Sequence, residues 1–193
     1  MVSSKRIGLL DTVETLSLHP ITDLQESSQL KVLEIRNQPG VRNNMYTIHE
    51  ISRQEHLQWI EKLKQTSSTR FFAVIFENEI IGGVSLNAIN TEHGRADWAY
   101  YLSEAMQGKG IGSALEFKFL DFVFLENNFQ KLNCEVLAFN DKVISLHNKF
   151  GFQQEGVRRK HILRDEKACD IVLLGITKDE WLQRRAALVS GVQ

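Results

Sequence analysis

The stretch Gln107-Gly108-Lys109-Gly110-Ile111-Gly112 decides the fold of this 193-residue chain. It stands between an apolar, strand-like run that ends at Leu102 and a strongly helical pattern over 111–126. Three glycines at alternate positions leave backbone N–H groups uncovered where the helix begins. Unpaired amide donors and the helix dipole both favour an anion at such a point, so the stretch predicts a phosphate-binding turn.

Two well-known phosphate-binding turns disagree with these residues. A Walker-type loop requires Ser or Thr after Gly-Lys, whereas Gly110 follows Lys109 here. A dinucleotide-binding turn requires a third glycine at position 113, which is Ser113, and it normally follows the first strand of the domain. Considered alone, the hexapeptide also permits a glycine-rich turn without any ligand.

Composition limits the class of protein. The chain is 42% hydrophobic and 24% charged, which is typical of one globular domain, and its formal net charge of −1 gives no basic field for nucleic acid. No apolar run reaches membrane-spanning length, and no signal-peptide pattern opens the chain, so we predict a cytoplasmic protein without a membrane partner. Cys134 and Cys169 lie in apolar surroundings, which predicts reduced thiols, and no metal-ligand spacing is present.

The pattern of elements predicts one mixed α/β domain over 14–189, after a loose N-terminal extension over 1–13. Two helices come early, one over 24–36 capped by Asp23 and one that starts at Ser52 with a capping box to Glu55. The expected strands are 14–20, 71–76, 80–87, 95–102, 131–138, 153–160 and 168–177, and the later helices are 111–126, 143–150 and one from 179 onward.

A second motif narrows the choice. After the helix and one further strand, the chain reads Asn140-Asp141-Lys142-Val143-Ile144-Ser145-Leu146-His147-Asn148-Lys149-Phe150-Gly151-Phe152. Together with the Gln/Arg-x-x-Gly-x-Gly/Ala pattern of Gln107, Gly110 and Gly112, this segment resembles the two signatures of the GNAT acetyltransferase superfamily. The resemblance covers about 16–181 and implies a mixed central sheet, splayed at the cofactor site, with helices on both faces.

This resemblance implies acetyl-CoA as the co-substrate. The pyrophosphate would lie at the turn, and the strand before it would pair its free backbone groups with the pantetheine arm. The helix that follows Asn140 would help to hold the pantetheine and nucleotide parts. The cofactor-binding residues so implied are Tyr101, Leu102, Gln107, Gly108, Lys109, Gly110, Ile111, Gly112, Asn140 and Ser145.

The chemistry of acyl transfer suggests two further residues. A thioester is already electrophilic, so the enzyme must position a neutral amine and accept its proton. Asp97 lies on the strand before the turn and shares a face with Tyr101, which makes it a candidate base, acting directly or through water, or a residue that orders the substrate. His147 occupies the position where the family usually has Tyr, and it is either a proton donor to the thiolate or a structural residue.

The N-terminal helix and loop are expected to choose the acceptor. Their candidate substrate-binding residues are Arg36, Asn37, Arg42, Asn43, Asn44, Met45 and Tyr46. Arginines of this kind can pair with a diphosphate. His49, His56 and His161 show no metal-like clustering and are interpreted as surface or incidental residues.

Within the superfamily, the chain resembles the ribosomal-protein acetyltransferase branch, and more narrowly the N-acetyltransferase of the pseudaminic-acid pathway. The narrower likeness rests on segments such as 135–140 and 146–152. It implies transfer of acetyl to the 4-amino group of UDP-4-amino-4,6-dideoxy-N-acetyl-β-L-altrosamine, a step that leads to flagellin glycosylation. Two alternatives stay open: a protein N-terminal or polyamine acetyltransferase, and a non-enzymatic acyl-CoA-binding regulator. Edge strands and the terminal helix leave room for a homodimer.

Overall fold

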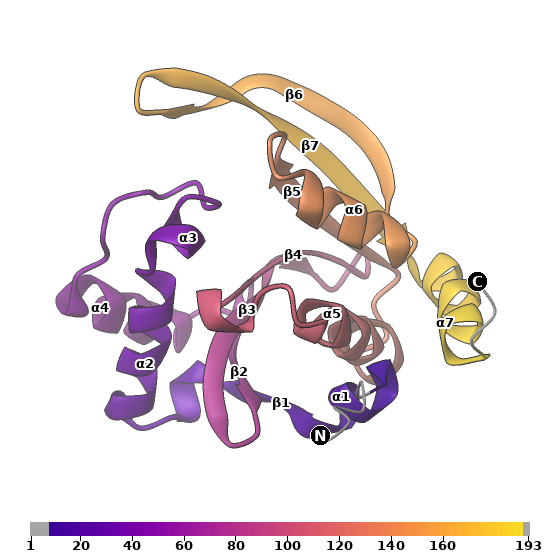
Figure 1. The fold of residues 1–193 in the computed structure, drawn as a ribbon, viewed down its shortest axis with the longest axis horizontal. Coiled ribbons are helices and arrows are strands. Elements are labelled where there is room, and N and C mark those ends of the chain that lie inside the picture. Colours follow the sequence, from indigo (N-terminus) through magenta and orange to yellow (C-terminus); the bar gives the residue numbers. More distant parts are fainter. Residues whose placement is uncertain (1–7, 191–193) are drawn as a thin grey trace, which may run out of the picture.

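The structure, a computed structural model, describes residues 8–190 and is built around one seven-stranded sheet (Figure 1). The strand order is β1-β2-β3-β4-β5-β7-β6, and every neighbouring pair is antiparallel except β4 and β5. The strands are β1 (Leu16–Pro20), β2 (Arg70–Phe76), β3 (Glu79–Asn90), β4 (Arg95–Leu102), β5 (Lys131–Leu137), β6 (Gln153–Arg164) and β7 (Lys167–Thr177).

The sheet separates in its middle. β4 pairs with β3 as far as its C-terminal end, where Leu102 faces Gly82. Its parallel pairing with β5 stops at the Asp97–Asn133 pair. Beyond Asp97, the N–H and C=O groups on that side of β4 therefore have no strand partner. The predicted mixed and splayed sheet is confirmed.

Helices cover both faces of the sheet. On one face, α2 (Glu26–Arg36) and α4 (Arg53–Leu63) enclose a small core around Val32, Ile60 and Ala73. The larger core lies on the other face and takes side chains from α5 (Ile111–Asp121), α6 (Asp141–Lys149), α7 (Lys178–Ser190) and α1 (Leu9–Thr15). The short helix α3 (Pro39–Arg42) leads into the loop before α4. No helix within residues 8–190 has the length and apolar character to cross a membrane.

Of the two predicted helix N-terminal caps, the one of α4 is confirmed and the one of α2 is wrong. The predicted capping box of α4 is confirmed, because Glu55 N donates to Ser52 Oγ at 3.2 Å and Ser52 N donates to Glu55 Oε2 at 3.3 Å. The predicted cap at Asp23 is wrong. Asp23 ends a 3₁₀ turn, and α2 begins only at Glu26, after Gln25, which makes no side-chain cap. Leu24 and Gln25 have extended backbones, with ψ of 151° and 153°, so no helix continues from Asp23 into α2.

The segment before β1 differs from the loose extension expected over 1–13. Leu9–Thr15 forms α1, and Leu9 and Val13 pack against the larger core. Lys118 Nζ on α5 also donates to Val13 O at 3.3 Å. Residues 1–7 of the expected extension lie outside the described part of the chain. This helix depends on contact with α5, which explains why no strong periodicity announces it.

A glycine on β3 allows an aromatic row to form on the α2/α4 face. The ring of Phe71 lies 6.2 Å from that of Tyr101 and 5.0 Å from that of Trp59. A Cβ atom at Gly83 would lie 2.3 Å from Phe71 Cζ, which no real contact permits. The absence of a side chain at position 83 therefore holds this row in place.

We expect Gly83→Ala to lower the free energy of unfolding by about 1–3 kcal/mol, because the new methyl group must displace the Phe71 ring. Gly156→Ala is the matched control, since a Cβ there would meet only Leu173 Cδ1, at 3.6 Å. Thermal and urea unfolding of both variants measure the difference. Equal stability of the two variants would contradict the steric argument.

Candidate active site

The glycine turn (107–112) presents an open backbone at the start of α5. Gly110 is the N-cap residue, with φ 84° and ψ −10°, and Gly108 has φ 72°. Both are left-handed conformations that glycine adopts at little cost. No atom lies within 4 Å of a Cβ placed on either residue, and no side chain caps the first amides of α5. These N–H groups are thus free to bind an anion such as a pyrophosphate.

Other residues of the turn shape it or anchor it. Gln107 Nε2 donates to Leu102 O at 3.1 Å, so this side chain closes the end of β4. Ile111 is buried and fixes the first turn of α5 in the core, whereas Lys109 is exposed. Backbone geometry, more than side-chain chemistry, therefore forms the anion site.

The turn, the free part of β4 and α6 meet at one point. A Cβ on Gly112 would lie 3.6 Å from Leu146 Cδ2 on α6, 3.8 Å from Tyr100 Oη and 3.9 Å from Leu102 Cδ1. Tyr101 turns its ring to the opposite face, against Phe71, and only its backbone follows the separated edge. The structure thus brings together the elements expected to hold acetyl-CoA.

Asn140 is the N-cap residue of α6, and Ser145 lies within that helix. The carbonyl oxygen of Asn140 accepts the amides of Val143 and Ile144, each at 3.1 Å, while its side chain makes no capping hydrogen bond. Ser145 is exposed one turn later. Their predicted contacts with the cofactor stay predictions, on a helix that the structure places beside the glycine turn.

Asp97 stands where β4 and β5 part. Asn133 Nδ2 donates to Asp97 Oδ1 at 3.0 Å, and this pair is the last one that joins the two strands. Asp97 lies on the α2/α4 face with Tyr101, while Trp98 points to the other face and stacks on Phe119 at 5.3 Å. The half-buried carboxylate is therefore held beside the strand separation by a neutral amide partner.

His147 lies in the core beneath α6. Its side chain is 4% exposed, and its Nδ1 is 2.9 Å from Glu116 Oε1 on α5, whose side chain is 0% exposed. The rings of Trp98 and Phe152 lie 5.3 and 5.0 Å from the imidazole. This environment differs from the open position that a proton donor to the cofactor sulfur requires.

Each of the two buried groups shifts the pKa of the other. Burial alone would lower the pKa of His147, but the Glu116 carboxylate, together with Cys134, outweighs it and raises that pKa to about 10. Burial likewise raises the pKa of Glu116, against the opposing effect of His147. Sequence reasoning missed Glu116, although an acidic residue between Leu115 and Phe117, one turn after Gly112, was a usable signal.

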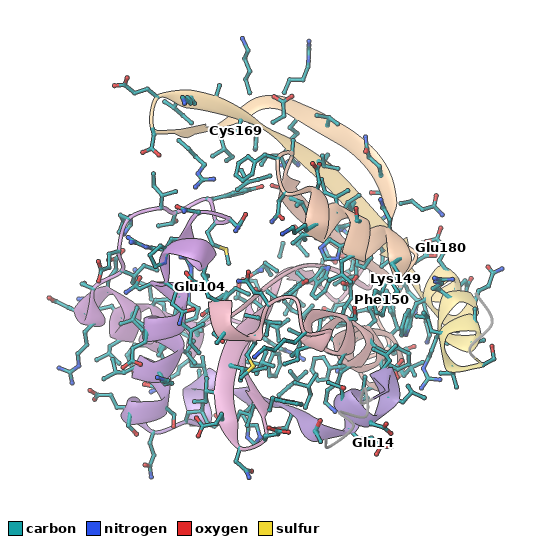
Figure 2. The ribbon with its side chains drawn as sticks, in the orientation of Figure 1. Glu14, Glu104, Lys149, Phe150, Cys169 and Glu180 are labelled. Carbon is teal, nitrogen blue, oxygen red and sulfur yellow. The ribbon has the colours of Figure 1, made fainter. Side chains whose placement is uncertain are left out.

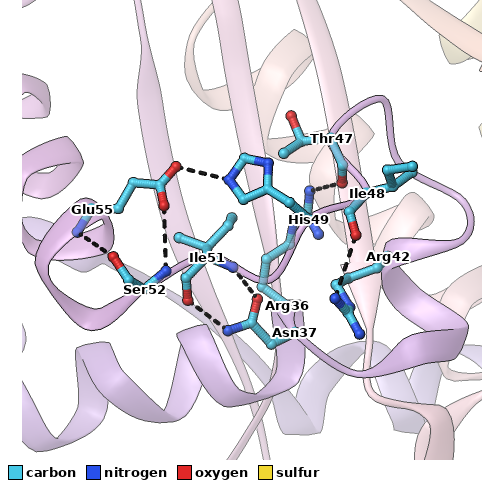
Figure 3. Close-up of polar contacts among 9 residues, drawn as sticks. All are labelled: Arg36, Asn37, Arg42, Thr47, Ile48, His49, Ile51, Ser52 and Glu55. Atoms are coloured by element: carbon cyan, nitrogen blue, oxygen red, sulfur yellow. Dashed lines mark hydrogen bonds and ion pairs between the residues drawn. The ribbon is translucent and has the colours of Figure 1, made fainter. Parts of the chain in front are cut away.

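Several of the expected acceptor residues organise their own loop (Figure 3). Asn37 makes two hydrogen bonds with the backbone of Ile51, at 2.8 and 2.9 Å. Arg36 Nη2 donates to Thr47 O at 3.1 Å, and Arg42 Nη1 donates to Ile48 O at 3.4 Å. These side chains hold the loop over 43–51, which the sequence pattern did not indicate.

The remaining acceptor residues lead towards the β6–β7 hairpin. Tyr46 Oη donates to Glu135 Oε2 on β5 at 2.7 Å, and Arg164 Nη1 near the hairpin tip donates to Asn43 O at 2.9 Å. Asn44 Nδ2 donates to Gly40 O at 2.8 Å, and Met45 is half-buried. Burial raises the pKa of Tyr46, so its hydroxyl stays protonated. The loop and the hairpin thus enclose the acceptor side together.

Two hydrogen bonds join the start of α3 to the 3₁₀ turn that precedes the glycine turn. Gly40 N donates to Glu104 Oε1 at 2.6 Å, and Glu104 N donates to Gln38 Oε1 at 2.8 Å. Glu104 lies in the 3₁₀ turn that connects β4 to the glycine turn, close to α3 (Figure 2). No local sequence pattern predicts this contact, because sixty-four positions separate Gly40 from Glu104.

The three remaining histidines of the sequence analysis and the two cysteines differ in burial. The interpretation of His56 as a surface residue is wrong: it is buried, and its Nε2 bonds to Gln29 O at 2.9 Å, which joins α4 to α2. His49 and His161 are exposed. Cys134 and Cys169 are free thiols, the first buried and the second half-buried. Among residues 8–190, no group of three or more potential ligands is placed to hold a metal ion.

Comparison with known proteins defines the family. Residues 16–153 match the family described as "Acetyltransferase (GNAT) domain". The SPbeta prophage-derived uncharacterized N-acetyltransferase YokL of Bacillus subtilis is 33% identical over 144 residues, which cover 73% of this chain and 80% of that protein. The chain therefore belongs to the GNAT acetyltransferases, and it is an acetyl-CoA-dependent N-acetyltransferase.

Two further comparisons cover most of the chain. Acetyltransferase PseH of Campylobacter jejuni is 26% identical over 156 residues, or 80% of this chain and 96% of that protein. The crystal structure of spermidine N-acetyltransferase from Vibrio cholerae, in complex with CoA and spermine, superposes with a TM-score of 0.80 at 23% identity, covering 88% of this chain and 99% of that one. The second likeness shows the fold alone.

We expect Gly110→Val to weaken acetyl-CoA binding at least about tenfold, because a branched side chain strains the left-handed backbone and fills the approach of the pyrophosphate. Isothermal titration calorimetry measures the affinity. Gly94→Ala is the control, since Gly94 also has a positive φ, of 59°, but lies in the turn between β3 and β4. Unchanged affinity in Gly110→Val, or an equal loss in the control, would refute the turn as the pyrophosphate site.

Proposed function

We propose that this enzyme transfers acetyl from acetyl-CoA to the 4-amino group of a UDP-4-amino-4,6-dideoxy sugar, of the kind used in pseudaminic-acid biosynthesis. The observation that carries the proposal is a pair of guanidinium groups, Arg36 and Arg42, that have no acidic partner in the described part of the chain. The resemblance to Acetyltransferase PseH over 96% of that protein's length supports the same substrate class.

The two arginines are unusual for partly buried cations. Within residues 8–190, neither forms a salt bridge, and Arg36 Nη1 and Arg42 Nε are buried without a hydrogen-bond partner. Burial lowers the pKa of Arg36, and the like charge of Arg42 lowers it further. Two adjacent cations with unsatisfied N–H groups are costly unless an anionic ligand completes them. A diphosphate supplies that charge and can accept several N–H donors at once.

The carboxylates on the α2/α4 face favour one amine over a polycation. Glu135 forms an ion pair with Arg158, and Glu155 forms one with Lys131. Asp97 is the member of this group that has no cationic partner within the described residues. A single free carboxylate fits an acceptor with one amino group, next to an anionic part that the arginines bind.

A polyamine is the second candidate acceptor. Spermidine N(1)-acetyltransferase of Escherichia coli is 36% identical over 89 residues, which cover 46% of this chain and 48% of that protein. The Vibrio cholerae enzyme has the same fold. However, a polyamine would bring further positive charge next to Arg36 and Arg42, which would raise the electrostatic cost of binding.

In the proposed reaction, the neutral amine attacks the thioester carbon directly. Its nitrogen forms the C–N bond while the C–S bond breaks, and Asp97 accepts the amine proton, directly or through a water molecule. CoA leaves as a thiolate that takes up a proton. Because thiolates are good leaving groups and His147 is enclosed in the core, we favour the structural alternative for His147.

The acceptor assignment is tested by measuring thiol release from acetyl-CoA with three amines: the UDP-4-amino sugar, spermidine, and a peptide that begins with Ala or Ser. We expect turnover with the nucleotide sugar. Arg42→Gln should raise its KM about tenfold by loss of a charge-assisted hydrogen bond while leaving acetyl-CoA affinity unchanged. Arg53→Gln, which removes an exposed partner of Glu26, is the control.

Turnover of spermidine or the peptide without turnover of the nucleotide sugar would overturn the substrate assignment. A KM that stays the same in Arg42→Gln would remove the anion-binding argument. Failure of all three amines, with tight acetyl-CoA binding, would favour an acceptor of another class or the non-enzymatic alternative.

We expect Asp97→Asn to lower kcat about a hundredfold, in line with the loss of a general base. The amide keeps the shape of the side chain and its contact with Asn133. Because the fold is then unaltered, acetyl-CoA affinity should change less than about threefold. Steady-state kinetics and calorimetry provide the two values. A full kcat in this variant would exclude Asp97 as the proton acceptor.

A further inference from the structure

Helices α5 and α6 touch at two levels along one seam. Gly112 and Glu116 are four residues apart and therefore lie on the same face of α5, one turn from each other. At the first level, Leu146 of α6 lies over Gly112, with its Cδ2 3.6 Å from the place where a Cβ atom of residue 112 would stand. At the second level, Glu116 Oε1 meets His147 Nδ1 at 2.9 Å. The same seam leads from the glycine turn into the core.

The second contact is not explained by stability. Both side chains are buried, the imidazole among aromatic rings, and within residues 8–190 Glu116 Oε2 has no hydrogen-bond partner. Removing two charges from water costs about as much as their attraction returns, so an apolar pair at these positions would hold the core at least as well. A buried ion pair of this kind differs from apolar packing mainly in its directionality, because it fixes two atoms at one distance.

We propose that Glu116 is a positioning residue for acetyl-CoA: through His147, it sets α6 at a defined place against α5, and so fixes Asn140 relative to the glycine turn. The backbone transmits this constraint. His147 O accepts hydrogen bonds from Phe150 N at 2.9 Å and Phe152 N at 3.1 Å, so the residue anchored by Glu116 also ends α6. The proposal concerns the cofactor side alone and is independent of the acceptor.

A double-mutant cycle on acetyl-CoA affinity tests this role. The variants are Glu116→Leu, His147→Leu and the double variant, and calorimetry measures the dissociation constant without any acceptor. We expect each single variant to bind acetyl-CoA about tenfold more weakly, and the double variant also about tenfold rather than a hundredfold, because all three lose the same interaction.

Phe117→Leu is the matched control. Phe117 is also buried on α5, but it packs on the Trp181 ring of α7, at 5.2 Å, and faces away from His147. The Phe117→Leu variant should have a lower melting temperature. Its acetyl-CoA affinity should stay within about threefold of that of the parent protein, because the substitution lies outside the Glu116–His147 contact. An equal loss of affinity in this control would overturn the proposal.

Three other outcomes would also overturn it: unchanged affinity in folded Glu116→Leu, additive losses in the double variant, or loss of turnover at unchanged affinity, which would make His147 a catalytic acid. Because His147→Leu leaves a buried carboxylate without its partner, which opposes folding, nitrogen-15 NMR of the parent protein provides a second measurement. The Nδ1 proton of His147 should exchange slowly, and more slowly with acetyl-CoA bound. A rapidly exchanging proton would contradict the proposed anchor.

Discussion

The separation of β4 from β5 beyond Asp97 is the constraint on which the rest of the site depends. Sheet hydrogen bonds stop at the Asp97–Asn133 pair, and the backbone of β4 continues to Leu102 with one free edge. Unpaired backbone groups inside a protein are costly, so this edge is stable only if a ligand or solvent completes it. In an acetyl-CoA-dependent enzyme, the amides of the pantetheine arm are suited to that role.

The two faces of β4 point to different parts of the candidate site. Towards α5 and α6, Trp98 and Tyr100 join an aromatic core that includes His147, and the glycine turn opens at its end. Towards α2 and α4, Asp97 and Tyr101 face the acceptor loop. Because successive side chains of a strand alternate, one short segment can support both the cofactor and the acceptor side.

Long-range contacts then couple the two sides. Glu104 joins α3 to the entrance of the glycine turn, and Tyr46 joins the same loop to Glu135 on β5. The loop that is expected to choose the acceptor is thus held from the cofactor side and from the hairpin side.

The sequence by itself determined the glycine turn, the capping box of α4, the order of strands and helices, and the face on which Asp97 lies. These features depend on neighbours within a few positions, such as left-handed glycines or strand alternation. Tertiary structure alone decided the partners of Glu116, Glu104 and Arg36, because each contact joins segments far apart in the chain. It also decided that α1 is a helix and that His56 is buried, since both follow from packing that no local pattern encodes.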